Sequence, residues 1–185
     1  MNNTDKVIVG IDPGTTIMGY GAIHIQGSSI KMLALGVLTL SKIDDHPLKL
    51  KKIFERTLGI IDEYKPDELA VEAPFYGKNV QSMLKLGRAQ GVAIAAAMYR
   101  NVPIFEYSPK KIKQSITGNG NASKEQVAAM LQNMFKIKEL PKDLDATDGL
   151  AVAVCHHYQN RISGTEKSNY SGWSAFVSKN PGRTK

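Results

Sequence analysis

The sequence contains a single cysteine, no internal repeat and no long apolar run. With Cys155 alone among 185 residues, an intramolecular disulfide is excluded. Cys155 lies within a short apolar segment, and we expect it to be a packed core thiol. Neither a signal peptide nor an apolar stretch long enough to cross a bilayer is evident. We therefore expect a cytoplasmic protein that makes no membrane contact.

Two classes of hydrolase are disfavoured by what is missing. No serine, histidine and aspartate occur in an order that suggests a nucleophilic hydrolase. His156 and His157 are adjacent and cannot face one site from a helix, so we expect core or surface roles for both. An actin-like ATPase also begins with a strand and a Gly-Thr turn, but it needs a second lobe and a late glycine-rich adenosine loop. A chain of 185 residues has no room for that lobe, and no such loop is present.

Length and charge favour one compact domain that binds a polyanion. A chain of 185 residues with a hydrophobic fraction of 42% can bury one sizeable core. The formal net charge is +7. The lysines and arginines behind this charge can bind the phosphates of nucleic acid, while the acidic residues described below can hold metal ions. The alternative is a protein that is merely soluble and basic.

The hydrophobic pattern predicts an α/β fold built on a five-stranded mixed sheet. Short apolar runs and alternating segments are typical of strands, whereas apolar residues three and four apart are typical of helices. The predicted strands are residues 7–11, 19–25, 30–40, 69–71 and 102–107. The predicted helices are residues 47–64, 80–100, 110–116, 123–135 and 144–158. This order gives a meander of three strands followed by right-handed crossovers to parallel strands, with helices flanking the sheet.

Local signals mark several boundaries in the chain. The Gly-Ser-Ser triplet at residues 27–29 is typical of a hairpin turn between the second and third strands. Ser123, with Gln126 three residues later, forms a capping-box pattern at the start of a helix. Residues 163–185 are rich in glycine, serine, asparagine and lysine and poor in aliphatic residues. We expect them to form a disordered basic tail.

Four acidic residues stand where predicted elements end or begin. Asp12 closes the first predicted strand and Glu72 closes the fourth, and these two strands can lie side by side and parallel. Asp145 and Asp148 are three residues apart at the start of the last helix, on one face. Carboxylates in one pocket repel each other, and divalent cations remove that repulsion while gaining oxygen ligands. The pattern therefore predicts a metal site of the kind that supports two-metal phosphodiester chemistry.

Each carboxylate also has a simpler interpretation on its own. Asp12 precedes a Pro-Gly pair, so its side chain could accept backbone hydrogen bonds within a turn. Asp145 could cap the last helix, and Glu72 could be a solvated strand end. The convergence of all four acids at one edge of the predicted sheet favours the metal site.

Four segments resemble, in order and spacing, the motifs of the RuvC family of Holliday-junction resolvases. Residues 9–21, from Val-Gly-Ile-Asp-Pro-Gly-Thr-Thr to Gly-Tyr-Gly, resemble the start of that family. Residues 71–75, Val-Glu-Ala-Pro-Phe, resemble its second motif, and residues 84–92 are similar to its central helix. Residues 145–151, Asp-Ala-Thr-Asp-Gly-Leu-Ala, resemble its last motif. The resemblance covers residues 6–160.

The resemblance implies a ribonuclease-H-like nuclease domain over residues 1–162 and a homodimer. It also implies an endonuclease that needs divalent metal, resolves four-way DNA junctions by paired nicks, acts in recombination and repair, and cooperates with a branch-migration motor. Asp12, Glu72, Asp145 and Asp148 match the four catalytic acids of the family. An all-oxygen site of this kind suits Mg²⁺, with two ions per site and Mn²⁺ as a substitute.

Six further residues are expected to contact DNA: Phe75, Tyr76, Lys110, Lys111, Lys113 and Lys124. An aromatic ring beside a nuclease centre can stack on the bases of an opened junction, and the resemblance supports Phe75 in this role. The alternative is that Phe75 caps the core. The resemblance matches Lys113 and Lys124 to basic positions near the DNA backbone, whereas a solvated helix face is the alternative for Lys110 and Lys111. Further phosphate candidates are Lys78, Lys85 and Arg88.

Two other functions remain compatible with many of these residues. A ribonuclease-H-like nuclease that acts on RNA or on RNA–DNA hybrids would carry the same catalytic acids. A structure-specific DNA-binding module without catalysis would need none of them, so the presence of all four argues against it. Competition among junction, hybrid and duplex substrates separates these alternatives.

Overall fold

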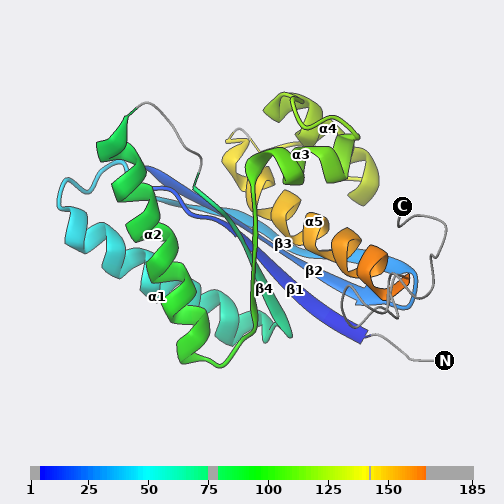
Figure 1. Cartoon of the computed structure of the whole chain (residues 1–185), viewed down its shortest axis with the longest axis horizontal. Helices are drawn as coiled ribbons and strands as arrows, with labels where there is room; N and C mark the ends of the chain where they lie inside the picture. Colours follow the sequence, from blue (N-terminus) through cyan, green and yellow to red (C-terminus); the bar gives the residue numbers. More distant parts are fainter. Residues whose placement is uncertain (1–4, 75–78, 142, 166–185) are drawn as a thin grey trace, which may run out of the picture.

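The computed structural model of the protein describes residues 5–74, 79–141 and 143–165. A five-stranded mixed sheet forms its centre (Figure 1). The strands are β1 (Asp5–Asp12), β2 (Ile17–Gln26), β3 (Ser29–Thr39), β4 (Glu68–Glu72) and β5 (Ile104–Tyr107). They lie in the order β3-β2-β1-β4-β5, with antiparallel pairing from β3 to β1 and parallel pairing from β1 to β5. The predicted sheet and its strand directions are confirmed.

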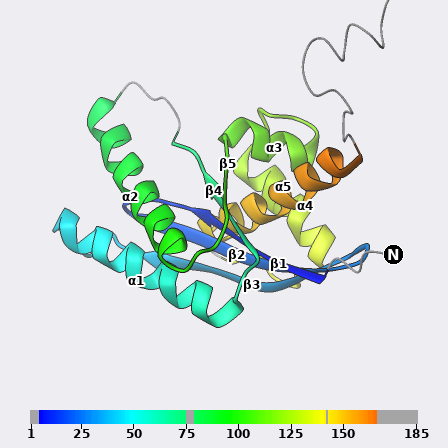
Figure 2. The ribbon, with the colours of Figure 1, turned by 60° about the horizontal axis from the view of Figure 1, so that its bottom comes forward.

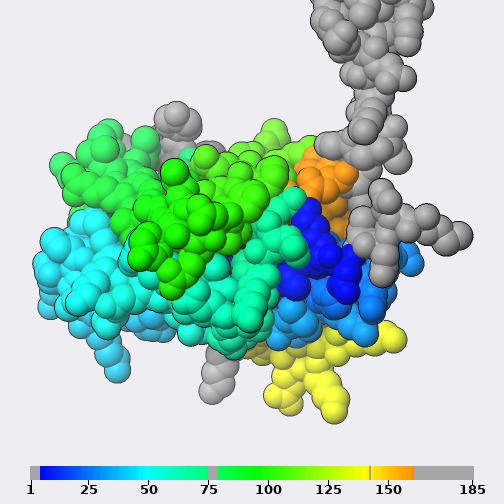
Figure 3. Space-filling view, turned by 90° about the horizontal axis from the view of Figure 1, so that it is seen from below, coloured from blue at the N-terminus to red at the C-terminus, as the bar shows by residue number. Residues whose placement is uncertain are grey.

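In the described part of the chain, five helices cover the two faces of the sheet. They are α1 (His46–Tyr64), α2 (Val80–Tyr99), α3 (Pro109–Thr117), α4 (Lys124–Phe135) and α5 (Asp145–Thr165). α1 and α2 lie side by side on one face, whereas α3, α4 and α5 cover the other (Figures 1 and 2). Seen from below, α1 in cyan and α2 in green form much of the surface of their face (Figure 3). None of the described helices is long and apolar enough to span a membrane.

The helices start where side chains accept the free N–H groups of the first turn. Asp45 accepts a hydrogen bond of 3.1 Å from the Leu48 N–H at the start of α1. Ser123 accepts from the Gln126 N–H at 3.3 Å, and the Gln126 side chain accepts from the Ser123 N–H at 2.9 Å. This reciprocal pair confirms the predicted capping box. The predicted hairpin turn is also confirmed, with Gly27 at a φ of 61° between β2 and β3.

The fifth strand starts later than the sequence predicts. Its first residue is Ile104 rather than residue 102. The Val102 N–H donates to the Ala97 carbonyl at the end of α2, with 3.0 Å between nitrogen and oxygen. Val102 therefore completes the end of the helix and does not join the sheet.

The last helix extends further than the sequence predicts. α5 continues to Thr165, past the predicted end at residue 158. Within this extension, the Asn160 side chain donates a hydrogen bond of 3.0 Å to Glu68 at the start of β4. The contact joins residues far apart in the sequence and therefore has no local signal.

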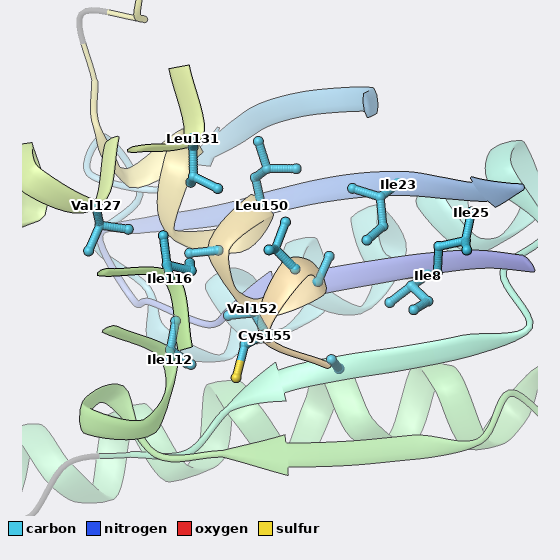
Figure 4. Close-up of a cluster of buried hydrophobic side chains, with 14 of the residues drawn as sticks. Ile8, Ile23, Ile25, Ile112, Ile116, Val127, Leu131, Leu150, Val152 and Cys155 are labelled. Atoms are coloured by element: carbon cyan, nitrogen blue, oxygen red, sulfur yellow. The ribbon is translucent and has the colours of Figure 1, made fainter. Parts of the chain in front are cut away.

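The core consists of two clusters of buried side chains, one on each face of the sheet. Beneath α3, α4 and α5, Ile8 and Ile23 of the sheet pack with Leu131 and Leu150 of the helices (Figure 4). Cys155 is fully buried in the same cluster, which confirms the prediction of a core thiol. The second cluster lies between the sheet and the pair α1 and α2.

His156 and His157 are both buried, so of the two expected roles, core or surface, the structure shows the core role. The Nδ1 atom of His156 lies 2.7 Å from the Tyr107 hydroxyl, and its Nε2 atom lies 2.5 Å from Glu68 Oε2. Lys6 forms an ion pair with the same Glu68 carboxylate. Since Glu68 begins β4 and the predicted catalytic acid ends it, this network lies at the opposite end of the strand from the candidate site.

α5 lies directly against the backbones of β1 and β2 because glycines line the contact. A Cβ atom added at Gly10 would overlap with the Gly149 carbonyl oxygen, and one added at Gly19 would overlap with the Asp145 carbonyl oxygen. Only glycine permits two backbones to approach so closely. The close approach brings the first turn of α5 to the carboxyl end of β1.

Candidate active site

The four predicted acids meet at the carboxyl ends of β1 and β4. Carboxylate oxygens of Asp12, Asp145 and Asp148 lie within 4.8 Å of one another. Glu72 ends the neighbouring parallel strand, and it lines a cavity of about 480 Å³ together with Asp12 and Asp148. The fold therefore gathers side chains from two strands and one helix into one acidic cluster, which we define as Asp12, Glu72, Asp145 and Asp148.

Burial and mutual repulsion disfavour the ionised forms of three acids of the acidic cluster, Asp12, Glu72 and Asp148. Burial, followed by the charge of Asp148, raises the pKa of Asp12 from 3.8 to about 7. Burial, followed by the charges of Asp12 and Asp148, raises the pKa of Glu72 from 4.5 to about 8. Burial also raises the pKa of Asp148. Groups whose pKa values are shifted in this way are typical of functional sites.

Lys124 brings a positive charge to the acidic cluster. Its Nζ atom lies 2.6 Å from Asp145 Oδ1 and 2.6 Å from Asp148 Oδ2. Burial disfavours the charged amine, but the hydrogen bonds and charges of the two aspartates outweigh burial and raise the pKa of Lys124. Burial likewise acts to raise the pKa of Asp145, but the Lys124 ammonium and the Asp143 side chain lower it. A cationic group is thus already held between two of the acids.

The donor set of the acidic cluster fits a divalent cation. All four side chains offer oxygen atoms, which Mg²⁺ and Mn²⁺ prefer. Asp148 Oδ2 is buried, and the Lys124 ammonium contacts it at 2.6 Å. A buried, repelling set of carboxylates is stabilised when a cation binds. The arrangement is therefore compatible with divalent metal binding.

The alternative interpretation of Asp145 as the helix cap is wrong. The Asp145 N–H donates to Asp143 Oδ1 at 3.1 Å, so the accepting side chain at the start of α5 belongs to Asp143. The Asp145 carboxylate pairs with Lys124. Asp143 was not among the predicted residues, although an aspartate just before a helix is a common capping signal.

Three of the four predicted DNA-binding lysines line the same cavity as the acids. Lys110 and Lys113 project from α3, and Lys124 stands at the start of α4. Lys111 is not among the lining residues; its side chain is exposed, and its carbonyl accepts the Cys155 thiol at 3.9 Å. In Figure 1, α3 and α4 lie beside the first turn of α5. These three lysines, Lys110, Lys113 and Lys124, therefore form a basic wall of the cavity beside the acidic cluster.

Some expected contact residues cannot be placed, and others were missed. Phe75 and Tyr76, the predicted base-stacking residues, lie outside the described residues, as does Lys78. Gly120 and Asn121, from the loop between α3 and α4, line the cavity and were not predicted to do so. Their composition indicated a loop, and only the tertiary fold brings that loop to the acids.

Comparison with known proteins identifies the family. The family model described as crossover junction endodeoxyribonuclease RuvC matches residues 8–156. A protein of that name from Cytophaga hutchinsonii is 60% identical over 181 residues, which cover 98% of this chain and 89% of the relative. Its counterpart from Porphyromonas gingivalis is 53% identical over 189 residues, with 100% of both chains covered.

Solved structures agree with the sequence comparison. Thermus thermophilus RuvC in complex with a Holliday junction substrate has a TM-score of 0.78 and 31% identity, covering 85% of this chain and 96% of that one. The yeast mitochondrial Holliday junction resolvase Ydc2 has a TM-score of 0.59 over 85% of this chain and 83% of its own. At 16% identity, the latter supports the fold alone. The RuvC structure and the observed five-stranded mixed sheet together confirm the predicted ribonuclease-H-like class. The matched family model and the relatives of high identity together show that the chain belongs to the RuvC family of crossover junction endodeoxyribonucleases.

Proposed function

We propose that this protein resolves four-way DNA junctions by paired, symmetric nicks, in recombination and DNA repair. The observation that carries the proposal is the acidic cluster at the carboxyl ends of β1 and β4, with Lys110, Lys113 and Lys124 lining the adjoining cavity. Acids that can hold metal beside lysines that can hold phosphates suit phosphodiester hydrolysis. The Thermus thermophilus relative, 31% identical, is bound to a Holliday junction substrate, which supports the same substrate here.

The proposed cofactors are two Mg²⁺ ions per site, with Mn²⁺ as a substitute. Asp12, Glu72, Asp145 and Asp148 would hold them through carboxylate oxygens. When bound, such ions supply a nucleophilic water and stabilise the leaving 3′ oxygen, which leaves 5′ phosphates and 3′ hydroxyls. The protein itself would gather the acids, exclude bulk water from them and orient the phosphate.

DNA contacts are assigned to Lys110, Lys113 and Lys124 and to Phe75 and Tyr76, which follow β4 in the sequence. Lys110, Lys113 and Lys124 face the cavity and would bind backbone phosphates beside the acids. The proposed role of Phe75 and Tyr76 is to stack on or wedge between bases at the opened junction. Residues 1–162 would act as one nuclease domain. The tail predicted over residues 163–185 can begin only after Thr165, because α5 includes residues 163–165, and residues 166–185 lie outside the described residues.

Metal binding should stabilise the protein more at high pH than at low pH. With pKa values raised to about 7 and about 8, Asp12 and Glu72 contribute most to the stability of the metal-free fold when they are protonated, at low pH. That contribution is lost as the pH rises through these two values, because the repelling carboxylates ionise. A divalent cation binds the ionised forms and offsets their repulsion. The melting temperature in Mg²⁺ minus that in chelator should therefore increase between about pH 6 and about pH 9, and a constant or decreasing difference would contradict the metal assignment.

The exposed face of α2 supports a homodimer. Val80, Leu84 and Met98 are 63%, 54% and 65% exposed, although all three are apolar. Gly87 and Gly91 leave open space where a Cβ atom would stand. Four of the five alanines of α2 instead pack into the core, namely Ala89, Ala93, Ala96 and Ala97, whereas Ala95 is exposed. An exposed apolar stripe with small residues is typical of a surface that a second helix covers.

The variant Gly91→Arg should convert the dimer into a monomer. An arginine in the middle of the stripe would place a charge and a long side chain between the two copies of α2. Sedimentation equilibrium at micromolar concentration measures the mass directly, with Gly59→Ala on the neighbouring helix as the control. A monomeric wild-type protein, or an unchanged dimer in the variant, would reject this interface.

Family membership also supports proposals for a protein partner and for the location of the protein in the cell. Cooperation with a branch-migration motor is proposed from family membership alone. A chromosomal DNA substrate would place the protein in the cytoplasm, as expected for its bacterial relatives.

Competition among nucleic acids tests the proposed substrate. A labelled four-way junction is incubated with the protein and Mg²⁺ in the presence of unlabelled junction, linear duplex or RNA–DNA hybrid. The proposal predicts nicks in paired positions that the unlabelled junction suppresses far more strongly than either competitor. Suppression by the hybrid would support a nuclease of another specificity, and binding without nicks would support a DNA-binding module.

A further inference from the structure

A second cavity lies between the N-terminal parts of α1 and α2, and we call it the α1–α2 cavity. Its volume is about 360 Å³. Hydroxyl, imidazole and ammonium groups line it, from Thr15, Thr16, His46, Lys49, Ser82 and Lys85. All of these groups can donate hydrogen bonds, and two of them are cationic. The composition suits an anion with several oxygen atoms, such as a phosphate group.

The α1–α2 cavity is connected to the catalytic cavity through a small hollow that shares lining residues with both. A hollow of about 120 Å³ is lined by Asp12 and Glu72, which also line the large catalytic cavity. The same hollow is lined by Leu86, which also lines the α1–α2 cavity. In Figure 1 the starts of α1 and α2 lie to the left of the first turn of α5, whereas α3 and α4 lie to its right. Three adjoining hollows therefore run from Lys113, past the acids, to Lys49 and Lys85.

One polar atom in this region is left without a partner. His46 Nε2 is buried and forms no hydrogen bond within the described residues. Buried polar atoms almost always have partners, so such an atom beside a cavity indicates a place for a ligand. Asp44 also lines the cavity, but Lys49 and Lys85 outnumber it. The local charge therefore still favours an anion.

We propose that the α1–α2 cavity binds a backbone phosphate of the junction strand that passes over the acidic cluster. The inference rests on the proposed function, since its ligand belongs to the same DNA. Lys49 and Lys85 neutralise the phosphate charge, and Ser82 donates to an oxygen that is not in the ester linkage. With Lys113 on the opposite side of the acids, the strand is held on both sides of the phosphate to be cut.

The double variant Lys49→Gln/Lys85→Gln tests the site through junction affinity. Fluorescence anisotropy is measured over a range of salt concentrations, with Ca²⁺ in place of Mg²⁺ to suppress cleavage. Each phosphate contact adds about −0.9 to the slope of log affinity against log salt concentration. Loss of one contact should make the slope less steep by about 1 and lower the affinity about tenfold at about 0.1 M salt. A melting curve confirms that the variant is folded.

Two further variants make the test specific. Lys51→Gln/Lys52→Gln removes the same total charge, here from α1 alone. These two lysines pair with Glu55 at 3.7 and 3.1 Å and are not among the residues lining the cavity. This pair should change the slope and the affinity far less. Asp44→Asn removes the acid from the cavity and should tighten junction binding severalfold. Inorganic phosphate at matched ionic strength should compete only weakly, because a strand phosphate is held by its neighbours as well.

The possible outcomes distinguish a failure of the proposed phosphate site from a failure of the proposed function. Equal losses in the two lysine pairs would overturn the proposal, since bulk charge would then explain the effect. An unchanged slope in Lys49→Gln/Lys85→Gln, or strong competition by inorganic phosphate, would overturn it too. If the wild-type protein fails to bind the junction at all, the proposed function itself fails. A wild-type protein that binds and cuts junctions with no contribution from Lys49 and Lys85 rejects this inference alone.

Discussion

Replacing Asp12 with asparagine should abolish junction cleavage and, at the same time, raise the melting temperature of the metal-free protein. Burial and the charge of Asp148 raise the pKa of Asp12 to about 7, so the ionised form destabilises the fold at pH 8. Asparagine has nearly the same shape without that charge. We expect a gain of about 2 kcal/mol in the free energy of unfolding, which is a rise of about 5 °C in a domain of this size.

The loss of cleavage by Asp12→Asn should be large because Asp12 belongs to the proposed metal site. A metal ion stabilises the transition state by several kcal/mol, and each 1.4 kcal/mol of lost stabilisation lowers the rate about tenfold. We therefore expect the single-turnover rate to fall at least about a thousandfold, while junction binding survives. Melting curves in chelator and single-turnover cleavage in Mg²⁺ measure the two effects.

Asp62→Asn is the matched control for Asp12→Asn. Asp62 is an exposed aspartate whose pKa is lowered, chiefly by its hydrogen bond with Arg100. Its replacement should leave cleavage unchanged and should not raise the melting temperature. If Asp12→Asn cleaves at a near-normal rate, Asp12 is not a catalytic residue. If it melts at a lower temperature than the wild type, the repulsion inferred for the acidic cluster is wrong.

The variant Gly19→Ala should damage both stability and cleavage, although the residue has no reactive group. An added Cβ would overlap with the Asp145 carbonyl oxygen and would lie 3.3 Å from the Gly149 nitrogen. The first turn of α5 would have to move away from β2, and it carries Asp145 and Asp148. Overpacking of this kind destabilises a protein by about 1–3 kcal/mol. A displacement of about 1 Å at a catalytic group can lower the rate about a hundredfold.

Gly59→Ala provides the control for the glycine substitution. Gly59 lies on the exposed side of α1, and a Cβ atom there would meet nothing within 4 Å. Alanine should stabilise the helix by about 0.5–1 kcal/mol and leave cleavage unchanged. Urea unfolding and single-turnover cleavage are measured for both variants. Wild-type cleavage by Gly19→Ala would show that the position of α5 does not set the geometry of the acidic cluster.

Much of the sheet and half of the site could be predicted from local patterns. β1 and β4 are buried on both faces, so they read as short continuous apolar runs, whereas β2 and β3 flank a recognisable turn. Asp12 and Glu72 end the two buried strands. Because parallel neighbours share one edge of a sheet, their proximity follows from the strand order.

The remainder of the site depends on contacts between residues far apart in the sequence. The spacing of Asp145 and Asp148 puts them on one helical face, but that helix reaches β1 because glycines on distant strands, among them Gly10 and Gly19, leave room for it. The pairing of Lys124 with Asp145 joins positions 21 residues apart. Near the end of the long α5, Asn160 contacts Glu68, and the local sequence gives no indication of this contact. Tertiary packing decides such features, and it overrides local propensity.

Metal-dependent resolution of a junction is measured with a synthetic four-way junction that has a mobile core, in Mg²⁺, in Mn²⁺ and in chelator. We expect paired nicks in both metals, linear products that a ligase can reseal, and no cleavage in chelator or on linear duplex. Cleavage that persists in chelator would contradict the metal role of the acidic cluster. Tight junction binding without cleavage in either metal would contradict the enzymatic function itself.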